Sequence, residues 1–263
     1  MATQHGEATS AVDAAELEAK VKRMYREVAL HPDGGFHFVM GRVLAERLGY
    51  PGDSLDRIPA AAIASFAGVG YAFGLASLQH GERILDLGSG SGMDSFFAAL
   101  QIAPGGQVVG IDMTPEQLGN AERLRRDAGF DSVAFREGHI EAMPFDAGSF
   151  DCVLSNGVIN LSAHKEQVFA EAARVLRPGG RLAISDIVTE RELTESIVCN
   201  TDLWASCIGG AAQVDTYRQA IESAGFAVQD IQENRAYSFL SEQARNASVT
   251  FGVKSVSLLA TRV

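Results

Sequence analysis

The sequence predicts an α/β sandwich in which helices cover a mostly parallel sheet of seven strands. The first observation is that short apolar runs alternate with helical segments from residue 79 onward, as in the strand-like run from Arg83 to Leu87 and the helical stretch after it. The second is that turns rich in glycine and proline separate these segments. Such alternation is typical of βαβ units, in which successive strands run parallel.

Composition places the chain among ordinary globular proteins. It has 263 residues, of which 46% are hydrophobic, and its 22 Lys and Arg against 33 Asp and Glu give a formal charge of −11. This length is enough for one large domain or two small ones. The acidic balance argues against nucleic acid as the main partner, because phosphate binding requires clustered Lys and Arg.

Three features predict the location of the protein. The start, MATQHGEATS, lacks the basic and apolar stretches of a secretory signal. Cys152, Cys199 and Cys207 are too few and too scattered for a disulfide framework. The uncharged segment 58–78 is long enough to cross a bilayer, but its content of Ala, Gly and Ser favours a buried segment. We therefore expect a cytoplasmic protein with no membrane partner.

Residues 1–78 are predicted to form a helical unit ahead of a core at 79–263. Apolar residues three or four positions apart, beginning at Leu17, predict the first helix. The predicted helices of this unit are 14–29, 36–48 and 59–66.

The core supplies the seven strands and the helices between them. The predicted strands are 83–87, 107–112, 132–136, 150–154, 181–188, 227–231 and 255–262. The predicted helices are 93–100, 115–129, 165–176 and 216–224. The second of these begins with Thr114-Pro115-Glu116-Gln117, which has the pattern of a capping box. Ligands of such sheets bind beyond the carboxyl ends of the strands, so functional residues are expected there.

A glycine-rich turn follows the first strand. Gly88, Gly90 and Gly92 let the backbone turn sharply and approach a ligand closely. The dinucleotide motif requires glycine or alanine where this chain has Met93. Asp86 precedes the turn, and its carboxylate would repel a pyrophosphate but suits a ligand with an ammonium group.

Two further strand ends carry candidate contacts. Asp112 ends the second strand and can accept hydrogen bonds from both hydroxyls of a ribose, or it can cap the helix that follows. After the third strand, Ile140 can pack on an adenine ring, and His139 or Glu141 can either meet its amino group or face solvent. An ammonium partner, a ribose carboxylate and an adenine site together describe S-adenosylmethionine better than NAD.

With these motifs the chain resembles a class I S-adenosylmethionine-dependent methyltransferase. The resemblance is carried by ILDLGSGSG (84–92), GIDMT (110–114), GHIEAMPF (138–145), FDCVLSN (150–156) and LRPGGRLAISD (176–186). It implies a Rossmann-like three-layer sandwich, with S-adenosylmethionine as cofactor and S-adenosylhomocysteine as product. It also extends the expected cofactor contacts to Ser89, Met113 and Asn156.

The chain resembles the arsenite methyltransferases more narrowly, through SNGVINLSAHK (155–165) and LWASCIGGA (203–211). That family holds As(III) with cysteine thiolates, which are soft ligands for a soft acceptor. The resemblance places family cysteines at Val69, Gly157 and Cys207, and in many members at Ser95, so that only Cys207 is retained.

The loss of these cysteines predicts an altered acceptor site. Cys207 alone cannot build a trigonal arsenic site; Cys199 can assist it if the segment between them is helical, and Cys152 is expected to be packing. Phe66, Tyr71, Phe73 and Trp204 can serve an organic acceptor or can simply be core. We therefore expect a methyltransferase that acts on a small molecule and holds no metal.

The acceptor chemistry gives three candidate catalytic residues. A hydroxyl acceptor requires a base, for which Asp186 and His164 are the candidates, although His164 can also flank its helix. Cys207 is the candidate arsenic ligand. The helices of residues 1–78, which include Tyr25, are expected to form a lid over the cofactor.

Three other functions remain open on the sequence. The protein can be an arsenite methyltransferase that uses Cys207 with other thiols, or a non-catalytic protein that binds S-adenosylmethionine. A nucleotide-binding oxidoreductase is disfavoured by the glycine spacing and by Asp86.

Overall fold

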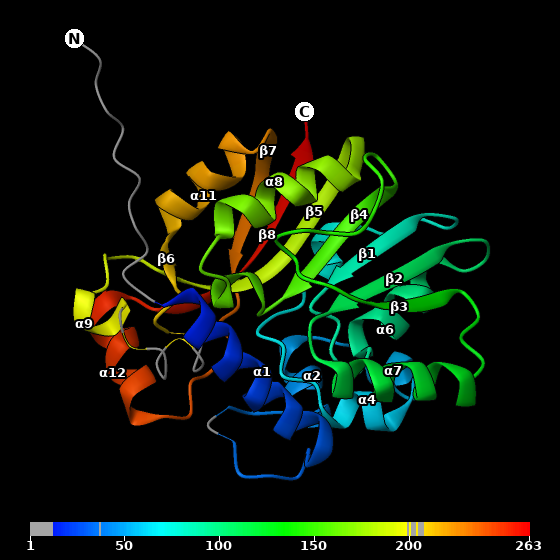
Figure 1. Cartoon of the computed structure of the whole chain (residues 1–263), viewed down its shortest axis with the longest axis horizontal. Coiled ribbons are helices and arrows are strands. Elements are labelled where there is room, and N and C mark those ends of the chain that lie inside the picture. The colour runs from blue at the N-terminus through cyan, green and yellow to red at the C-terminus, as the bar shows by residue number, and fades with distance from the viewer. Residues whose placement is uncertain (1–12, 37, 199, 201–203, 205–207) are drawn as a thin grey trace.

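The computed structural model describes residues 13–263 except 37, 199, 201–203 and 205–207. Its centre is a single sheet with the strand order β3-β2-β1-β4-β5-β8-β7, and a short β6 pairs with the end of β5 (Figure 1). The strands are β1 (Arg83–Leu87), β2 (Gln107–Asp112), β3 (Val133–Glu137), β4 (Phe150–Asn156), β5 (Leu176–Thr189), β6 (Ala212–Gln213), β7 (Phe226–Glu233) and β8 (Lys254–Arg262).

All neighbouring strands are parallel except β8, which runs antiparallel to both β5 and β7. The seven long strands confirm the predicted mostly parallel sheet, and β6 is an addition of two residues. The order reverses at β1, which pairs with β2 on one side and β4 on the other. This is the switch point at which open α/β sheets bind ligands.

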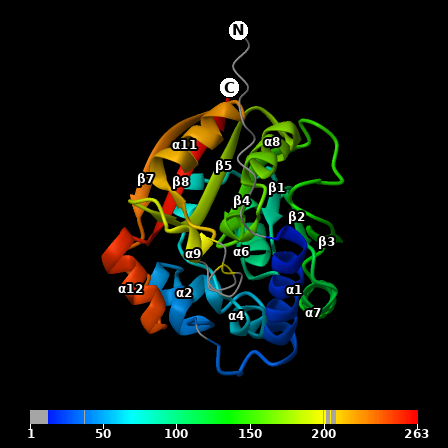
Figure 2. The same cartoon turned by 60° about the vertical axis from the view of Figure 1, so that its left-hand side comes forward.

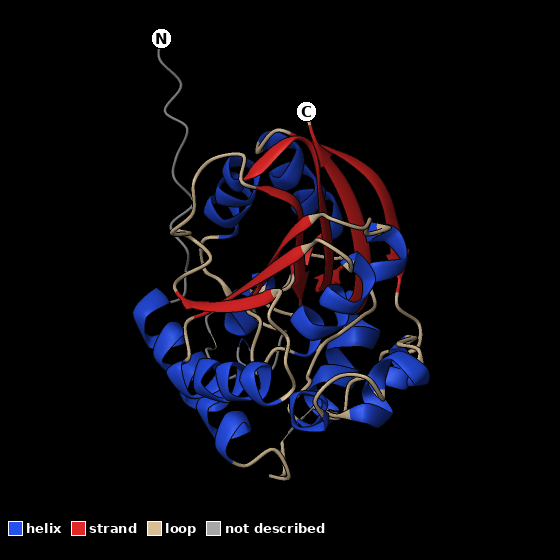
Figure 3. Ribbon diagram, turned by 90° about the vertical axis from the view of Figure 1, so that its right-hand side faces the viewer, coloured by secondary structure: helices blue, strands red, loops and turns tan. Residues whose placement is uncertain are grey.

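Helices pack on both faces of the sheet, as Figure 3 shows with the strands in red. The helices of the core are α6 (Met93–Ile102), α7 (Pro115–Asp127), α8 (Lys165–Val175) and α11 (Val214–Ser223), with the single turn η1 (Ile159–Leu161) after β4. Apolar residues of α8 and α11 pack against one face, where Phe169 and Ile221 are fully buried. Those of α6 pack against the other, where Phe96 and Phe97 are buried.

Of the N-terminal helices, α1 lies alongside α7 in both Figure 1 and Figure 2, whereas α5 packs against β5 and β8. These helices are α1 (Ala14–Leu30), α2 (Arg42–Leu48), α3 (Gly52–Leu55), α4 (Ala60–Ala64) and α5 (Phe73–Ala76). Segment 58–78 forms two of these short helices with buried side chains such as Ile63. Within the described residues, no helix has the length and apolar character that crossing a membrane requires.

The structure shifts the bounds of two predicted elements and adds helices that were not predicted. The helix expected over 36–48 begins only at Arg42, because Gly41 precedes it with a φ of +81°. Strand β5 begins at Leu176, which pairs with Phe150 ahead of the predicted start. Four α-helices of the described residues were missed: α3, α5, α9 (Glu195–Val198) and α12 (Glu242–Phe251). The signal for α12 was Ser241, whose side chain accepts from the backbone N–H of Ala244 at 3.1 Å.

Gly92 controls how closely α6 approaches the sheet. It caps the helix with a φ of +95°, and a Cβ there would lie 2.7 Å from Cζ of Phe135 and 2.9 Å from Cε2 of Phe96. Both rings belong to the packed layer between α6 and β3. A side chain at this position would therefore separate the helix from the strand.

We expect Gly92→Ala to lower the free energy of unfolding by about 2–4 kcal/mol, from backbone strain together with overpacking. The matched control is Gly225→Ala, which has a φ of +92° but no atom within 4 Å of the new Cβ. Strain alone should cost the control about 1 kcal/mol. Urea titrations of both variants measure the difference, and equal losses would show that packing at Gly92 is unimportant.

Candidate active site

A cavity of about 450 Å³ opens beyond the carboxyl ends of β1, β2 and β4. Its floor is the turn after β1, and its walls are the segments that follow β2, β3 and β4. Residues of α1 and of the segment 62–68 close the remaining side. The cavity therefore lies at the switch point of the strand order.

Nearly all of the cofactor residues predicted from the sequence lie on the wall of this cavity. They are Asp86, Gly88, Ser89, Gly90, Asp112, Met113, Ile140, Glu141 and Asn156. Gly92 is the exception, because it faces the packed layer between α6 and β3.

The glycine turn is held by hydrogen bonds to the end of β2. The N–H groups of Gly88 and Ser89 both donate to the carbonyl of Ile111, at 2.8 and 3.0 Å. Ser89 Oγ is buried and has no hydrogen-bond partner among the described residues. Gly88 and Gly90 line the cavity with φ values of +65° and +53°, so bare backbone faces a ligand there and the turn fits a bound cofactor.

Asp86 places a buried carboxylate beside the turn, with 2% of the residue exposed. Its Oδ2 accepts a hydrogen bond from Ser95 Oγ at 2.6 Å, so the serine at a family cysteine position orients this carboxylate. Burial raises the pKa of Asp86 well above its usual range, and the nearby charge of Asp94 raises it further. A cation bound here would reverse that shift, which fits the ammonium group expected from the sequence.

Asp112 joins the turn to the start of α7. Its Oδ2 accepts from the N–H of Gly90 at 2.9 Å and its Oδ1 from the N–H of Thr114 at 2.8 Å. Desolvation raises its pKa despite these hydrogen bonds. A carboxylate offers about four lone-pair sites, so these two hydrogen bonds leave acceptors for ribose hydroxyls.

The capping box predicted at Thr114 does not form. The Thr114 side chain makes no capping hydrogen bond; Asp112 instead accepts from the backbone N–H of Thr114 itself, one residue ahead of the helix. The Gln117 side chain instead accepts from Ser91 Oγ at 2.5 Å and donates to the carbonyl of Tyr25 at 3.0 Å. Gln117 therefore connects the glycine turn with α1.

The segment after β3 brings Ile140 and Glu141 to the same wall. Glu141 Oε1 accepts from Ser162 Oγ at 2.5 Å, so this carboxylate faces the cavity rather than bulk water. His139 also lines the cavity, and its Nδ1 lies 3.9 Å from Oε2 of Glu18 on α1.

Sequence reasoning missed a polar network centred on Asp94. Its Oδ1 accepts from the hydroxyl of Tyr50 at 2.6 Å, and its Oδ2 accepts from Nδ2 of Asn156 at 3.1 Å. Asn156 Oδ1 accepts in turn from the N–H groups of Val69 and Gly70, at 2.7 and 3.2 Å. The available signal was the position of Asp94 in the first turn of α6, directly after the glycine turn.

The three catalytic candidates fall in different places. His164 lies on the cavity wall, and its backbone N–H donates to Ser162 Oγ at 3.0 Å. Cys207 lies outside the described residues, as does Cys199. Cys152 is a buried free thiol of β4 whose pKa burial raises to about 12, as expected for a packing residue.

Asp186 lies away from the cavity wall and is 1% exposed. Its oxygens accept from the hydroxyl of Tyr217 at 2.7 Å and from the N–H groups of Asn160 and Ile187 at 3.0 and 2.9 Å. Burial raises its pKa to about 6. Because its oxygens bind these groups, the geometry favours a structural role over that of a base in contact with an acceptor.

Two of the family cysteine positions lie against each other. Gly157 has a φ of +74°, and a Cβ there would lie 3.2 Å from Cγ1 of Val69. Val69 is 1% exposed and packs in an apolar cluster with Ile187 and Ala244. Among the residues that the structure describes, no three His, Cys, Asp or Glu side chains form a group that could hold a metal ion.

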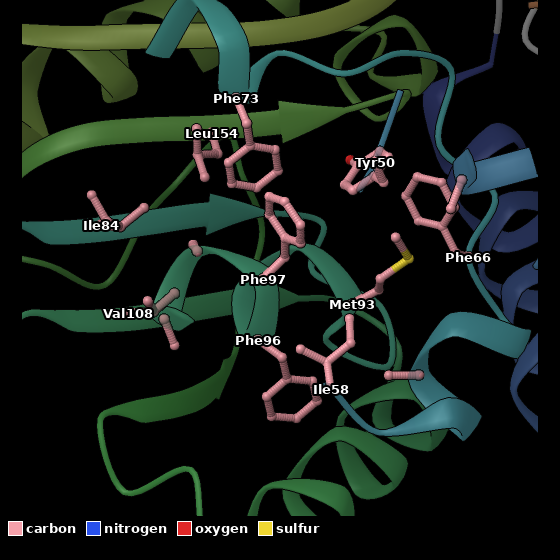
Figure 4. Packing of buried hydrophobic residues seen from close by; sticks show 14 of the residues in the cluster. Tyr50, Ile58, Phe66, Phe73, Ile84, Met93, Phe96, Phe97, Val108 and Leu154 are labelled. Atoms are coloured by element: carbon pink, nitrogen blue, oxygen red, sulfur yellow. The ribbon is translucent and has the colours of Figure 1, made fainter. Parts of the chain in front are cut away.

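Only one of the four candidate aromatic side chains reaches the cavity. Phe66 lines it, whereas Tyr71 and Phe73 pack with Tyr50 and Phe97. Figure 4 shows the rings of Phe73, Phe97 and Tyr50 turned toward one another. Trp204 packs with α1, and Lys165 Nζ lies 4.6 Å from the centre of its ring.

The strand order, the glycine turn and the cavity at the switch point are those of class I methyltransferases, whose cofactor is S-adenosylmethionine. Residues 78–225 match the family model described as a methyltransferase domain, and the chain belongs to this family.

The chain is also similar to arsenite methyltransferases of several organisms. The arsenite methyltransferase of Halobacterium salinarum is 38% identical over 203 residues, which are 75% of this chain and 51% of that protein. Human arsenite methyltransferase is 44% identical over 153 residues, or 54% of this chain and 40% of that protein. The chain thus spans about half the length of the curated relatives it matches.

One solved structure supports the same relationship. The arsenic(III) S-adenosylmethionine methyltransferase of Chlamydomonas reinhardtii superposes with a TM-score of 0.61 and 28% identity, over 85% of this chain and 74% of that one.

Asp94 should make stability depend on pH. Burial raises its pKa from 3.8 to about 6, so the folded protein holds this proton more tightly than the unfolded chain. The resulting stabilisation is present below about pH 4 and is lost as the pH rises through 6. Asn at position 94 does not titrate, so the variant Asp94→Asn lacks this loss. Between pH 4 and 7 the free energy of unfolding should therefore fall by about 1–3 kcal/mol less in the variant than in the wild type. Urea titrations across this range measure the difference, and parallel curves would contradict it.

Proposed function

We propose that this protein transfers a methyl group from S-adenosylmethionine to a small molecule, at an acceptor site that differs from that of the arsenite methyltransferases. The observation that carries the proposal is the pairing of Val69 with Gly157 beside the cavity that the expected cofactor residues line. An apolar contact occupies positions where the family resemblance places two arsenic-binding thiolates.

The cofactor cavity supports specific roles for its wall residues. Asp86 would bind the ammonium group, Asp112 the ribose hydroxyls, and Ile140 with Glu141 the adenine. S-adenosylmethionine supplies a methyl group already activated on a sulfonium. The protein therefore has mainly to position the acceptor and exclude water.

Residues 1–78 would form a lid over the bound cofactor, and α1 is the part of this segment that is suited to cover it. Leu17, Val21 and Tyr25 of this helix line the cavity. Side chains of α7 hold it in place: Asn120 donates to the carbonyl of Ala29 at 2.9 Å, and Glu116 pairs with Arg26 at 2.8 Å.

His164 is the candidate base for an acceptor that loses a proton, because it lies on the cavity wall and Asp186 does not. The chain is acidic, with 22 Lys and Arg against 33 Asp and Glu, and its undescribed positions contain no Lys or Arg. This balance supports a small molecule rather than nucleic acid as the acceptor. The scattered cysteines support a reducing cytoplasm as its location.

A second candidate is an arsenite methyltransferase that uses Cys207 with thiols from solution. The names of the relatives from Halobacterium salinarum and human favour it. The missing thiolates at positions 69 and 157 argue against it.

Cofactor binding tests the first step. We expect Asp112→Asn to weaken S-adenosylmethionine binding by about 10- to 100-fold, because hydrogen bonds to a charged group contribute about 1.5–3 kcal/mol. Isothermal titration calorimetry measures the affinity. Asp127→Asn, at the exposed end of α7, is the control and should bind normally. Unchanged affinity in Asp112→Asn would refute the ribose assignment.

Restoring the thiolates tests the altered acceptor site. We expect Val69→Cys/Gly157→Cys to methylate arsenite, in the presence of a thiol reductant, at least about tenfold faster than the wild type, since soft thiolates bind As(III). Release of S-adenosylhomocysteine and formation of methylated arsenic give the rates. The control adds Cys207→Ser, which should abolish the gain.

The left-handed φ at Gly157 should cost the thiolate variant about 1 kcal/mol of stability, so its unfolding is measured alongside. Wild-type turnover of arsenite as fast as that of the folded variant would favour the second candidate.

A further inference from the structure

The cavity wall carries many negative groups and no strongly basic ones. Among the described residues, its lining includes five carboxylates and no Lys or Arg; the carboxylates belong to Glu18, Asp86, Asp94, Asp112 and Glu141. The undescribed positions cannot add a Lys or an Arg to this lining, because their sequence contains neither. Histidine, a weak base, is the remaining basic residue type in the lining.

Cationic side chains of α1 and α8, next to the cavity, bind protein groups rather than face the cavity. Lys22 Nζ lies 3.5 Å from Oε1 of Glu18, and Arg26 pairs with Glu116. Lys165 Nζ donates to the carbonyl of Ser162 at 2.8 Å and lies over the ring of Trp204. None of these cations lines the cavity.

Burial does not create a site for an anion either. It raises the pKa of Asp86, Asp94 and Asp112, which favours the neutral form of each carboxyl. A proton removes a negative charge without supplying a positive one. A carboxylate or phosphate on the acceptor would lose its hydration here without gaining an ionic partner, which is costly.

Apolar side chains also form part of the wall outside the expected cofactor contacts. They include Leu17 and Val21 of α1, Phe66 and Ala67 before the core, and Leu161 of η1. A second, small cavity of about 20 Å³ shares Tyr25 and Ala67 with the first.

That second cavity extends the apolar surface toward α12. Its lining includes Phe38, Val69, Tyr237 and Phe239, and the last two rings meet edge to face at 5.2 Å. The space in the second cavity therefore lies mainly between aromatic and aliphatic side chains.

We propose that the acceptor is an apolar organic molecule that carries no negative group, bound between α1, Phe66 and the pair Val69–Tyr237, and that acceptors with a negative group are rejected. This inference rests on the proposed methyl transfer and names the substrate class for it. In the transfer, the nucleophilic atom of the acceptor forms a bond to the methyl carbon. The carbon–sulfur bond breaks with its electron pair returning to sulfur, and a proton on the nucleophile leaves to solvent or to His164.

Three probes of nearly equal shape separate charge from size. They are 4-ethylphenol, which is uncharged, 4-hydroxyphenylacetate, which is anionic, and tyramine, which is cationic. Each is titrated into the protein saturated with S-adenosylhomocysteine, and binding is followed by saturation-transfer NMR. We expect 4-ethylphenol to bind at least about tenfold more tightly than 4-hydroxyphenylacetate, since an unpaired anion is repelled by the wall carboxylates.

The outcomes distinguish this inference from the function on which it rests. Binding of 4-hydroxyphenylacetate as tight as that of 4-ethylphenol or of tyramine would overturn the inference, and so would binding of none of the three, while the methyl transfer itself would stand. Failure of S-adenosylhomocysteine to bind would overturn both.

A pair of variants at Tyr25 tests whether the lack of a cation in the cavity wall is the reason that anions are rejected. Tyr25 is half-buried and lies on the walls of both cavities. Tyr25→Lys should improve binding of 4-hydroxyphenylacetate relative to 4-ethylphenol by about tenfold, because it places an ammonium group in the wall. Tyr25→Met, of similar length and without charge, should leave that ratio unchanged. Equal ratios in the two variants would overturn the inference.

Discussion

One side-chain amide, that of Asn156 at the end of β4, joins the two halves of the cavity. Its oxygen accepts from the backbone of Val69 and Gly70, and its nitrogen donates to Asp94, to the hydroxyl of Tyr50 and to the carbonyl of Gly70. The cofactor side and the segment before the core are thereby fixed to the same strand end. Only an amide offers both an acceptor and two donors on one planar group, so neither aspartate nor leucine could replace it.

The strands and the glycine turn could be predicted because their signals are local. A buried strand such as β1 is a short apolar run, and the turn after it is marked by its glycines. The positions of Asp86 and Asp112 follow from the same local pattern, since each lies at a strand end that faces the cavity.

What the sequence could not reveal depends on contacts between distant segments. The partner of Asp94 is Tyr50, which lies 44 positions earlier in the chain. Asp186 looked like a base because it ends the predicted fifth strand, but Tyr217 of α11 covers it. The capping box failed for a similar reason, since Gln117 is drawn to Ser91 and to α1. In each case a tertiary hydrogen bond replaced the local one that spacing suggests.

The hydrogen bonds that attach α1 to α7 do not depend on which side chains α1 carries. Gln117 and Asn120 both donate to backbone carbonyls of α1, those of Tyr25 and Ala29. Every residue presents the same carbonyl, so these two bonds survive a change of side chain at either position. The cavity-facing positions of α1 can therefore vary through evolution while the helix keeps its place, which makes this helix a natural site for one cofactor scaffold to acquire new acceptors.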